Sequence, residues 1–437
     1  MKIFKQNQPL YGEVTLPGDK SISHRAVIVA SQAEGISEIR NLSNCLDVHK
    51  TITSLLQSGT KITRNSKTTY VHSEGLANFN FLDNSLYIGN SGTATRLLMG
   101  LFASSQYKLT FYGDSLAETR PISRLIEPLS LMGATFTTES DDILPLTMIG
   151  NIDLKAINYK LNIPSSQVKS AILLAALNVK GTTILTESQR TRNHTEIILK
   201  YFGADITIKD NIVSITGQKK LTPKIIDIPG DPSSAAFITV AALCIADSCI
   251  CLKNICINQQ RIGFYNILRQ MGANIEFQNI RNTYGEEVAD IKICASKLKG
   301  INIPPELAPS MIDEYPILAI ACSFASGATV MYGIDELKYK ESNRMDAIFI
   351  ELSKCGIEVE RGDDWIAIKG TNGHIKGGVS VACHRDHRMS MSLIVAGLIS
   401  EDGLEIDDID IINTSFPEFF SILKELNCTI YDKELVL

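Results

Sequence analysis

The stretch SLLQSGTKIT, residues 54–63, joins a helix-like run to a strand-like run through Gly59, and this pattern recurs along the chain. Gly is the usual residue just past a helix C-terminus because it tolerates the left-handed conformation, and Asn is the next most tolerant. Neighbouring copies lie 69 to 84 residues apart, close to one sixth of the 437-residue chain. The copies are 54–63, 128–137, 198–207, 267–276, 351–360 and 422–431, with Gly59, Gly133, Gly203, Gly272, Gly356 and Asn427 at the shared position.

A second, more apolar helix and a strand precede each copy. These helices are apolar nearly all round, which is typical of helices buried in a core. They are expected at 24–33, 93–103, 168–179, 235–246, 315–325 and 388–399. The sequence therefore predicts an α/β protein built from six repeated units, each with an apolar helix, a strand, an amphipathic helix and one or two further strands.

Composition and charge exclude several classes of protein. Hydrophobic residues make up 44% and charged residues 21%, and the net charge of −6 gives no general attraction to nucleic acid or anionic membranes. The start MKIFKQNQPLYGEV lacks the apolar core of a signal peptide, and the apolar run 235–246 is too short to span a bilayer. Ten scattered cysteines without a CxxC pair indicate a reducing compartment and buried thiols. We therefore expect a cytoplasmic protein without membrane or nucleic-acid partners.

Motifs for common cofactors and metals are also missing. Neither GxGxxG nor GxxxxGK[ST] occurs, so dinucleotide and Walker-type sites have no support. Residues 383–387 (CHRDH) suggest zinc only weakly, because no second ligand pair has zinc-like spacing. We expect no cofactor and no metal.

The polar segments before the apolar helices contain cations among good capping residues. In chain order they are DKSISHR, GNSGTATR, PSSQVK, GDPSSA, MIDEY and RDHRMS. Ser, Thr, Asn and Asp cap helices, so plain capping is one interpretation. A basic helix start opposes the helix dipole, however, whereas free N–H groups there bind phosphate and carboxylate. Cations beyond capping favour an anionic ligand, and they are Lys20, Arg25, Arg96, Lys169 and Arg388, with Gln167 and His387 beside them.

Ten motifs, in order along essentially the whole chain, resemble the enolpyruvyl transferase family, and within it the branch that uses shikimate 3-phosphate. They are LPGDKSISHRA, GNSGTATRLL, RPISRLIEPLSLMGA, SSQVKSAILLAAL, TRNHTE, PGDPSSAAF, IDEYPILAIA, KYKESNRM, DHRMSMS and SFPEFF. The resemblance implies two domains of three βαββαβ-like units with buried parallel helices. Residues 1–18 plus 229–437 would form one domain, residues 19–228 the other, and the active site would lie in the cleft between them.

The activity implied by this resemblance is transfer of the enolpyruvyl group of phosphoenolpyruvate to the 5-hydroxyl of shikimate 3-phosphate, with release of phosphate. Both substrates carry a phosphate and a carboxylate, which suits a site rich in Arg and Lys. By resemblance, Asp313 is the base, Glu341 the proton donor, and Lys20 lies close to both substrates. Shikimate 3-phosphate would contact Lys20, Ser21, Arg25, Ser165, Ser166, Gln167, Thr191, Asp313 and Lys340, and phosphoenolpyruvate would contact Lys20, Asn90, Gly92, Arg120, Arg344 and Arg388.

Several residues depart from the family pattern or support it indirectly. Thr414 and Ser415 stand where the family often has a Lys before Phe-Pro, and Glu336 stands where some members carry Asn. Arg96 is equally well interpreted as a structural ion pair or a ligand contact. We interpret His24 and His384 as surface or supporting residues, and His194 and Glu196 as support for the loop of Thr191.

Three other functions remain open from the sequence. The same chemistry on UDP-N-acetylglucosamine is disfavoured because that branch typically begins with a Lys-Asn pair and lacks KESNR. A nucleic-acid end-processing protein is disfavoured by the acidic total and the lack of a basic and aromatic stripe. A non-catalytic anion-binding module would gain nothing from Asp313 and Glu341. We expect a monomer that takes only these small-molecule substrates.

Overall fold

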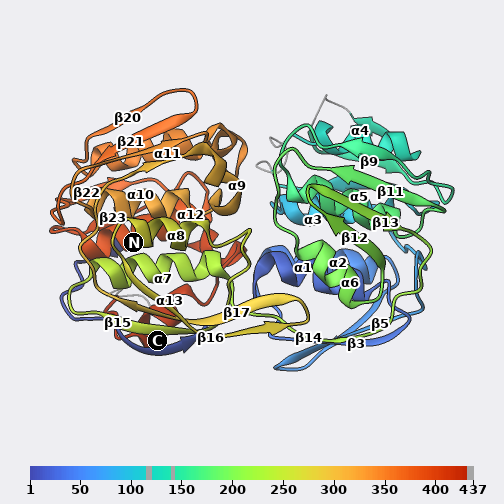
Figure 1. Ribbon diagram of the computed structural model, residues 1–437, viewed down its shortest axis with the longest axis horizontal. Coiled ribbons are helices and arrows are strands. Elements are labelled where there is room, and N and C mark those ends of the chain that lie inside the picture. Colours follow the sequence, from blue (N-terminus) through green and yellow to red (C-terminus); the bar gives the residue numbers. More distant parts are fainter. Residues whose placement is uncertain (115–120, 139–142, 431–437) are drawn as a thin grey trace. The chain divides into compact units, whose positions relative to one another are not determined.

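The computed structural model describes residues 1–114, 121–138 and 143–430, and Arg120 lies outside this range. The described chain forms two compact units. Unit 1 contains residues 1–17, 229–281 and 287–437, and unit 2 contains residues 18–228 with the short segment 282–286. Each unit is described by itself below, with the element labels of Figure 1.

Unit 2 consists of three repeats with the same order of elements: strand, apolar helix, strand, amphipathic helix, strand, strand. The first repeat is β14 (Ile225–Asp227), α1 (Lys20–Ala30), β3 (Gly35–Arg40), α2 (Leu46–Gln57), β4 (Lys61–Arg64) and β5 (Thr68–Ser73). The second is β6 (Ser85–Tyr87), α3 (Gly92–Phe102), β7 (Lys108–Tyr112), α4 (Ser123–Met132), β8 (Thr135–Thr138) and β9 (Leu146–Ile149). The third is β10 (Asn158–Lys160), α5 (Ser166–Ala176), β11 (Thr182–Thr186), α6 (His194–Tyr201), β12 (Asp205–Lys209) and β13 (Ile212–Thr216).

Unit 1 repeats this order with small additions. Its first repeat is β2 (Tyr11–Thr15), α7 (Pro232–Cys244), β15 (Cys249–Cys256), α8 (Gly263–Gln270), β16 (Asn274–Thr283) and β17 (Glu286–Cys294). The second is β18 (Asn302–Ile303), η2 (Pro305–Leu307), α9 (Ala308–Met311), α10 (Tyr315–Phe324), β19 (Ala328–Tyr332), η3 (Asp335–Tyr339), α11 (Arg344–Lys354), β20 (Val359–Arg361) and β21 (Trp365–Lys369). The third is β22 (Val379–Val381), α12 (His387–Ile399), β23 (Leu404–Ile406), η4 (Asp410–Thr414) and α13 (Phe419–Glu425), completed by β1 (Lys2–Ile3).

The six sheets share one topology. Five have four strands, in the orders β14-β3-β5-β4, β6-β7-β9-β8, β10-β11-β13-β12, β2-β15-β17-β16 and β18-β19-β21-β20. In the four-stranded sheets the first two strands named are parallel, as in β14 with β3 and β2 with β15. The sixth sheet has β22 parallel to β23 and β1 antiparallel to β23. The six-repeat α/β fold expected from the sequence is therefore confirmed.

Two strands, β2 and β14, each belong to a different unit from the helix that follows them in the chain. β2 directly precedes α1 in the chain, yet it pairs with β15 of unit 1. β14 directly precedes α7, yet it pairs with β3 of unit 2. This exchange makes unit 1 discontinuous in sequence.

All six amphipathic helices end in the same hydrogen-bonded turn. The glycine or asparagine predicted at the shared position has a positive φ in every copy, from 67° at Asn427 to 119° at Gly133. The amide of the following residue donates to the carbonyl of a leucine five positions earlier, at 2.9–3.1 Å. This is the Schellman motif, which satisfies carbonyl groups left open at a helix end. The leucines are Leu55, Leu129, Leu199, Leu268, Leu352 and Leu423, and all are buried.

Each unit buries its three apolar helices together, as Figure 1 shows for α7, α10 and α12 in unit 1. Every residue of α7 and of α12 is buried. In unit 2, α3 packs against both α1 and α5. α3 approaches α5 so closely that a Cβ built on Gly100 would lie 2.3 Å from the carbonyl oxygen of Ala171. Solvent can therefore reach little of these helices other than their ends.

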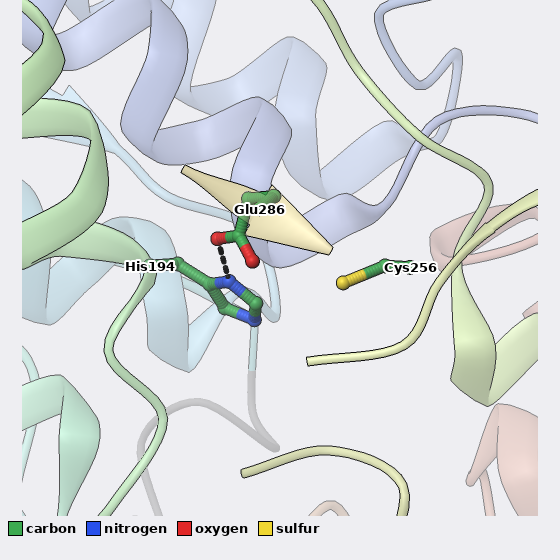
Figure 2. Close-up of side chains that lie close together, drawn as sticks. All are labelled: His194, Cys256 and Glu286. Carbon is green, nitrogen blue, oxygen red and sulfur yellow. Dashed lines mark hydrogen bonds and ion pairs between the residues drawn. The ribbon is translucent and has the colours of Figure 1, made fainter. Parts of the chain in front are cut away.

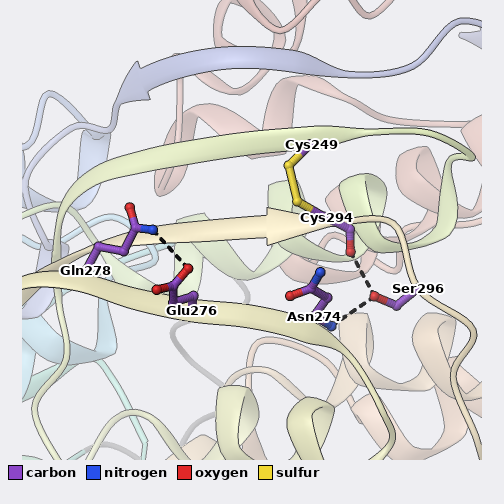
Figure 3. The surroundings of a disulfide bond; sticks show 6 residues. All are labelled: Cys249, Asn274, Glu276, Gln278, Cys294 and Ser296. Carbon is purple, nitrogen blue, oxygen red and sulfur yellow. Dashed lines mark hydrogen bonds between the residues drawn. A yellow bond between two sulfur atoms is a disulfide. The ribbon is translucent and has the colours of Figure 1, made fainter.

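The cysteines are mostly buried thiols, as the sequence indicates, with one exception. Cys249 and Cys294 form a disulfide, which the expectation of a reducing compartment did not include. The two residues face each other on the antiparallel strands β15 and β17, and their Cα atoms are 4.1 Å apart (Figure 3). Because they are 45 residues apart in sequence, only the strand register brings them together. The other eight cysteines are not part of a disulfide, and seven of them are buried.

The described helices can be compared with the length and apolarity of a membrane-spanning helix. None of the helices in the described residues combines the length and apolarity that crossing a bilayer requires.

The turn shared by the six helix ends predicts how substitutions of Gly356 change the stability of the protein. At Gly356 φ is 83°, and a new Cβ would meet no atom within 4 Å. Gly356→Ala should lower the free energy of unfolding by about 1 kcal/mol, because only the backbone conformation is strained. Gly356→Asn should cost less, since Asn tolerates this conformation. Urea denaturation of both variants checks this. Equal stability of wild type and the Ala variant would contradict the assignment of this turn.

Candidate functional site

The apolar helices of unit 2 begin at the residues predicted to bind substrate. Lys20 and Ser21 open α1, Gly92 opens α3, and Ser166 opens α5. Each helix is capped by the side chain just before it: Asp19 accepts from the amide of Ile22, Ser91 from Ala94, and Ser165 from Val168. Different amides and side chains can serve capping and anion binding, so capping does not exclude the predicted substrate contacts at these ends.

Arg25 is held in a network of hydroxyl groups. It is buried, and its Nε donates to Thr195 Oγ1 at 2.6 Å while Nη2 donates to Ser170 Oγ at 3.0 Å. Its Nη1 donates to the carbonyl of Ser21, one turn earlier in α1, at 2.9 Å. Thr195 in turn donates to Ser170 at 2.7 Å. The network orients the guanidinium through residues of α1, α5 and α6.

Lys20 and His24 lie on α1 in different surroundings. Lys20 Nζ is 3.0 Å from Asp47 Oδ2, and both side chains are 13% exposed, so the ammonium group remains accessible. His24 is completely buried, contrary to a surface position, and its Nδ1 lies 2.7 Å from Thr51 Oγ1. Burial, followed by the charges of Lys20 and Arg25, lowers the pKa of His24 well below its ordinary value. His24 is therefore a neutral supporting residue.

The starts of α3 and α5 are tied together. Gln167 Nε2 donates to Thr93 Oγ1 at 3.0 Å, which links these two helix ends directly. Arg96 donates to the carbonyls of Gly92 at 3.0 Å and Pro121 at 2.8 Å. Asn90 stands just before α3, and its Oδ1 is buried without a hydrogen-bond partner among the described residues. Arg120, assigned to phosphoenolpyruvate by resemblance, lies outside the described residues.

The loop of Thr191 is anchored by a buried charged cluster. Thr191 donates its hydroxyl at 2.5 Å and its amide at 3.1 Å to Glu187 Oε1. Lys169 is completely buried and contacts Glu187 at 3.0 Å and Glu196 at 2.7 Å. Lys169 is therefore paired with carboxylates inside the unit. The sequence had suggested instead a cation that faces an anionic ligand.

His194 supports the same loop from the other side. Its Nδ1 lies 2.5 Å from Glu286 Oε1, a residue of the segment 282–286 that belongs to unit 2, and both side chains are fully buried (Figure 2). Glu196 pairs with Lys169, as described above. His194 and Glu196 hold the start of α6, three to five residues after Thr191.

Unit 1 brings its predicted residues together around one buried guanidinium. Arg344, at the start of α11, is completely buried, and its Nε donates to Asp386 Oδ2 at 2.7 Å while Nη2 reaches Oδ1 at 3.2 Å. Burial works to lower the pKa of Arg344, but the charges of Asp386 and Glu341 outweigh it and raise the pKa. Burial likewise works to raise the pKa of Asp386, which the charge of Arg344 brings below its ordinary value. The pair is therefore fully ionised.

The two predicted catalytic carboxylates touch the same guanidinium. Arg344 Nη2 is 2.5 Å from Glu341 Oε2, and Nη1 is 3.5 Å from Asp313 Oδ1. Arg388, in the first turn of α12, donates to the carbonyl of Asp313 at 3.3 Å and lies 3.8 Å from Oδ2 of its carboxylate. Asp313 and Glu341 are 16% and 21% exposed, so both carboxylates remain accessible.

The other unit 1 residues singled out in the sequence are of two kinds. Two lie close to Glu341 in the chain, and two stand where the family often has a lysine. Lys340 ends η3 in an extended conformation directly before Glu341, and Glu336 lies in η3 itself. Thr414 donates its hydroxyl to the carbonyl of Ile411 at 2.7 Å, and Ser415 Oγ is buried with no hydrogen-bond partner in the part of the chain that the structure describes. A hydroxyl turned into its own helix is a poor substitute for the long cation that the family often has there.

Three residues that position the candidate site were not expected from the sequence: Asp386, Thr195 and Glu187. Asp386 had a signal, since it is the capping residue of RDHRMS and its Oδ1 accepts from the amide of Arg388 at 2.9 Å. Thr195 lies within the TRNHTE motif, and nothing local indicates that it holds Arg25. Glu187 follows a strand and has no local signal.

Comparison with known proteins agrees with this arrangement. The family model described as EPSP synthase (3-phosphoshikimate 1-carboxyvinyltransferase) matches residues 4–423. A 3-phosphoshikimate 1-carboxyvinyltransferase of Parvibaculum lavamentivorans is 44% identical over 426 residues, covering 96% of this chain and 94% of the relative. One from Zymomonas mobilis is 43% identical over 433 residues, covering 97% and 96%.

Solved structures extend the agreement to three dimensions. An EPSP synthase of Acinetobacter baumannii superposes with a TM-score of 0.88 at 36% identity and covers 98% of both chains. The enolpyruvyl transferase NikO of Streptomyces tendae has a TM-score of 0.79 at 16% identity, again over 98% of both chains, and shows the shared fold alone. From the family match and the near full-length relatives, this chain belongs to the EPSP synthase (3-phosphoshikimate 1-carboxyvinyltransferase) family.

Proposed function

We propose that the protein transfers the enolpyruvyl group of phosphoenolpyruvate to the 5-hydroxyl of shikimate 3-phosphate and releases phosphate. The observation that carries this is the cluster of Asp313 and Glu341 around Arg344 and Arg388. Acid–base chemistry on an anion needs accessible carboxylates beside fixed cations, whereas a simple anion trap would exclude carboxylates from its wall.

The reaction assigns a separate task to each carboxylate. Asp313 takes the proton of the 5-hydroxyl, whose oxygen then bonds to C2 of phosphoenolpyruvate while Glu341 delivers a proton to its methylene carbon. The resulting tetrahedral intermediate loses phosphate when the new methyl group returns a proton to Glu341 and Asp313 gives its proton to the departing phosphate, which restores the enol double bond. Lys20, close to both substrates in this proposal, stabilises the charge that develops during these steps.

Contact with Arg344 explains how Glu341 changes its protonation. An adjacent guanidinium favours the ionised carboxylate, and in this structure Arg344 contacts Glu341. A phosphoenolpyruvate carboxylate bound to Arg344 competes for that contact and places negative charge beside Glu341. Both effects favour a protonated Glu341, as the donor role requires.

The residues of unit 2 suit the anionic groups of shikimate 3-phosphate. The starts of α1, α3 and α5 supply amides, and α1 also carries Lys20, Ser21 and Arg25. Ser165 and Ser166 stand at the start of α5, and Thr191 lies in the loop before α6. In the structure Thr191 donates to Glu187, so binding a phosphate through its hydroxyl requires rotation of that group. Asp313 and Lys340 would meet the ring hydroxyls, while Asn90, Gly92 and Arg120 would serve phosphoenolpyruvate.

Several wider expectations remain part of this proposal. They are the two domains bounded near residues 18 and 229, a cleft between them as the active site, a cytoplasmic location and a monomeric state. The reaction itself is tested by mixing the protein with both substrates and following phosphate release. Release with UDP-N-acetylglucosamine, but none with shikimate 3-phosphate, would favour the alternative branch of the family.

Arg25 and Arg388 should affect different substrates. Loss of one charge-assisted, partly buried contact costs roughly 2–5 kcal/mol. Arg25→Ala should therefore weaken shikimate 3-phosphate much more than phosphoenolpyruvate, and Arg388→Ala should do the reverse, as measured by calorimetry and KM. The exposed pairs of Arg40 and Arg361 supply matched controls, Arg40→Ala and Arg361→Ala. Equal losses for both ligands in both variants would refute the assignment.

Asp313 should matter for the rate more than for binding. Asp313→Asn keeps the size of the side chain but removes the base, so kcat should fall by roughly 10²–10⁴. Shikimate 3-phosphate should still bind within about tenfold of wild type, because its phosphate supplies most of the binding energy. Asp363→Asn, in an exposed hairpin, controls for loss of a carboxylate. A variant that keeps more than about a tenth of kcat would exclude Asp313 as the base.

A further inference from the structure

Two consecutive non-glycine residues adopt a left-handed backbone directly before the site of unit 1. His384 and Arg385 have φ values of 54° and 55°, and Asp386 follows them. Such conformations are unfavourable for residues with a Cβ and persist only where the surroundings hold them. Asp386 caps α12 and binds Arg344, so this strained turn leads directly into the cluster.

Glu351 supplies the contacts that hold the turn. It lies in α11 with its side chain completely buried, and its Oε2 accepts from the amide of Ala382 at 3.1 Å. Its Oε1 accepts from His384 Nε2 at 2.7 Å. Lys354 Nζ, which is 43% exposed on its side chain, lies 2.8 Å from the same carboxylate. A buried carboxylate with backbone and side-chain donors is a firm anchor.

The anchor and the cluster are built on the same helix. Glu351 follows Arg344 by seven residues, about two turns of α11, so both side chains extend from one face. Arg344 holds segment 382–388 at Asp386, while Glu351 holds it at Ala382 and His384. Between these two points the amide of Cys383 donates to Asp407 Oδ1 at 2.8 Å, and the amide of Asp386 donates to the carbonyl of Cys383 at 3.0 Å.

We propose that Glu351 is a positioning residue for the phosphoenolpyruvate side of the site. By holding residues 382–385 in their left-handed turn, it sets the position of Asp386, and through Asp386 it orients Arg344 and the start of α12 with Arg388. The inference deepens the proposed function and rests on it for the identity of the ligand. It assigns His384 the role of a link between Glu351 and the turn.

The first test changes the anchor. Glu351→Gln keeps the size, but its single acceptor oxygen cannot serve Ala382, His384 and Lys354 together. KM for phosphoenolpyruvate should rise about tenfold, with KM for shikimate 3-phosphate changed by less than about twofold, because the displaced groups contact mainly the former. Lys354→Ala removes the exposed partner of Glu351 and should leave both KM values unchanged. A purely structural role would lower the melting temperature without this selective change.

The second test asks whether the backbone conformation is what Glu351 maintains. Arg385 is exposed, so substitutions there leave the core intact. Adding Arg385→Gly to Glu351→Gln should restore KM for phosphoenolpyruvate to within about threefold of wild type, because glycine adopts the turn without a holding contact. Arg385→Val alone should raise the same KM, since a β-branched residue opposes a positive φ, whereas Arg385→Asn should not.

The outcomes separate this inference from the proposed function. If wild type releases phosphate but neither Glu351→Gln nor Arg385→Val selectively raises KM for phosphoenolpyruvate, the positioning role is wrong. Lack of glycine rescue also overturns it. If Glu351→Gln does not fold, the single substitutions Arg385→Val and Arg385→Asn decide alone. If wild type shows no phosphate release, the proposed function fails, and faster amide hydrogen exchange at residues 382–388 in Glu351→Gln still supports the anchor, while unchanged exchange overturns it.

Discussion

Burial of one apolar helix in every repeat is the constraint on which the rest of this structure depends. A helix covered on all sides can offer a ligand only its ends, and its N-terminus presents unpaired amides with a favourable dipole for anions. The same ends therefore carry the capping residues, the cations and the hydroxyls, as at α1, α5 and α12. Six repeats bring six such ends, and the family chemistry draws on two strongly anionic substrates.

Local features of the fold were predictable because their physics is local. A glycine after an amphipathic run stops a helix wherever it occurs, and all six shared positions, including Asn427, have the positive φ expected of them. The starts of the helices were equally predictable, because capping residues mark them in the sequence. The exchange of β2 and β14 was predictable only through family resemblance, because strand partners depend on the register of a sheet.

The residues of the candidate site could be proposed from the sequence, but the contacts among them could not. Arg344 and Asp386 are 42 residues apart, Glu351 and His384 are 33 apart, and Cys249 and Cys294 are 45 apart. No spacing rule joins residues at such distances, since packing of α11 on segment 382–388 decides the first two. Charge alone also misled at Lys169, because a lysine near a helix start can equally point inward to buried carboxylates.

Arg344 illustrates how one buried charge can serve both structure and chemistry. Its contact with Asp386 is fully buried and bidentate, and breaking such a pair would leave an uncompensated charge inside the protein. Its contacts with Glu341 and Asp313 involve side chains that are 21% and 16% exposed. In the proposed function a ligand carboxylate replaces these contacts while the buried pair keeps the guanidinium in place. In that proposal a carboxylate gains or loses its counter-charge without any movement of the arginine that supplies it.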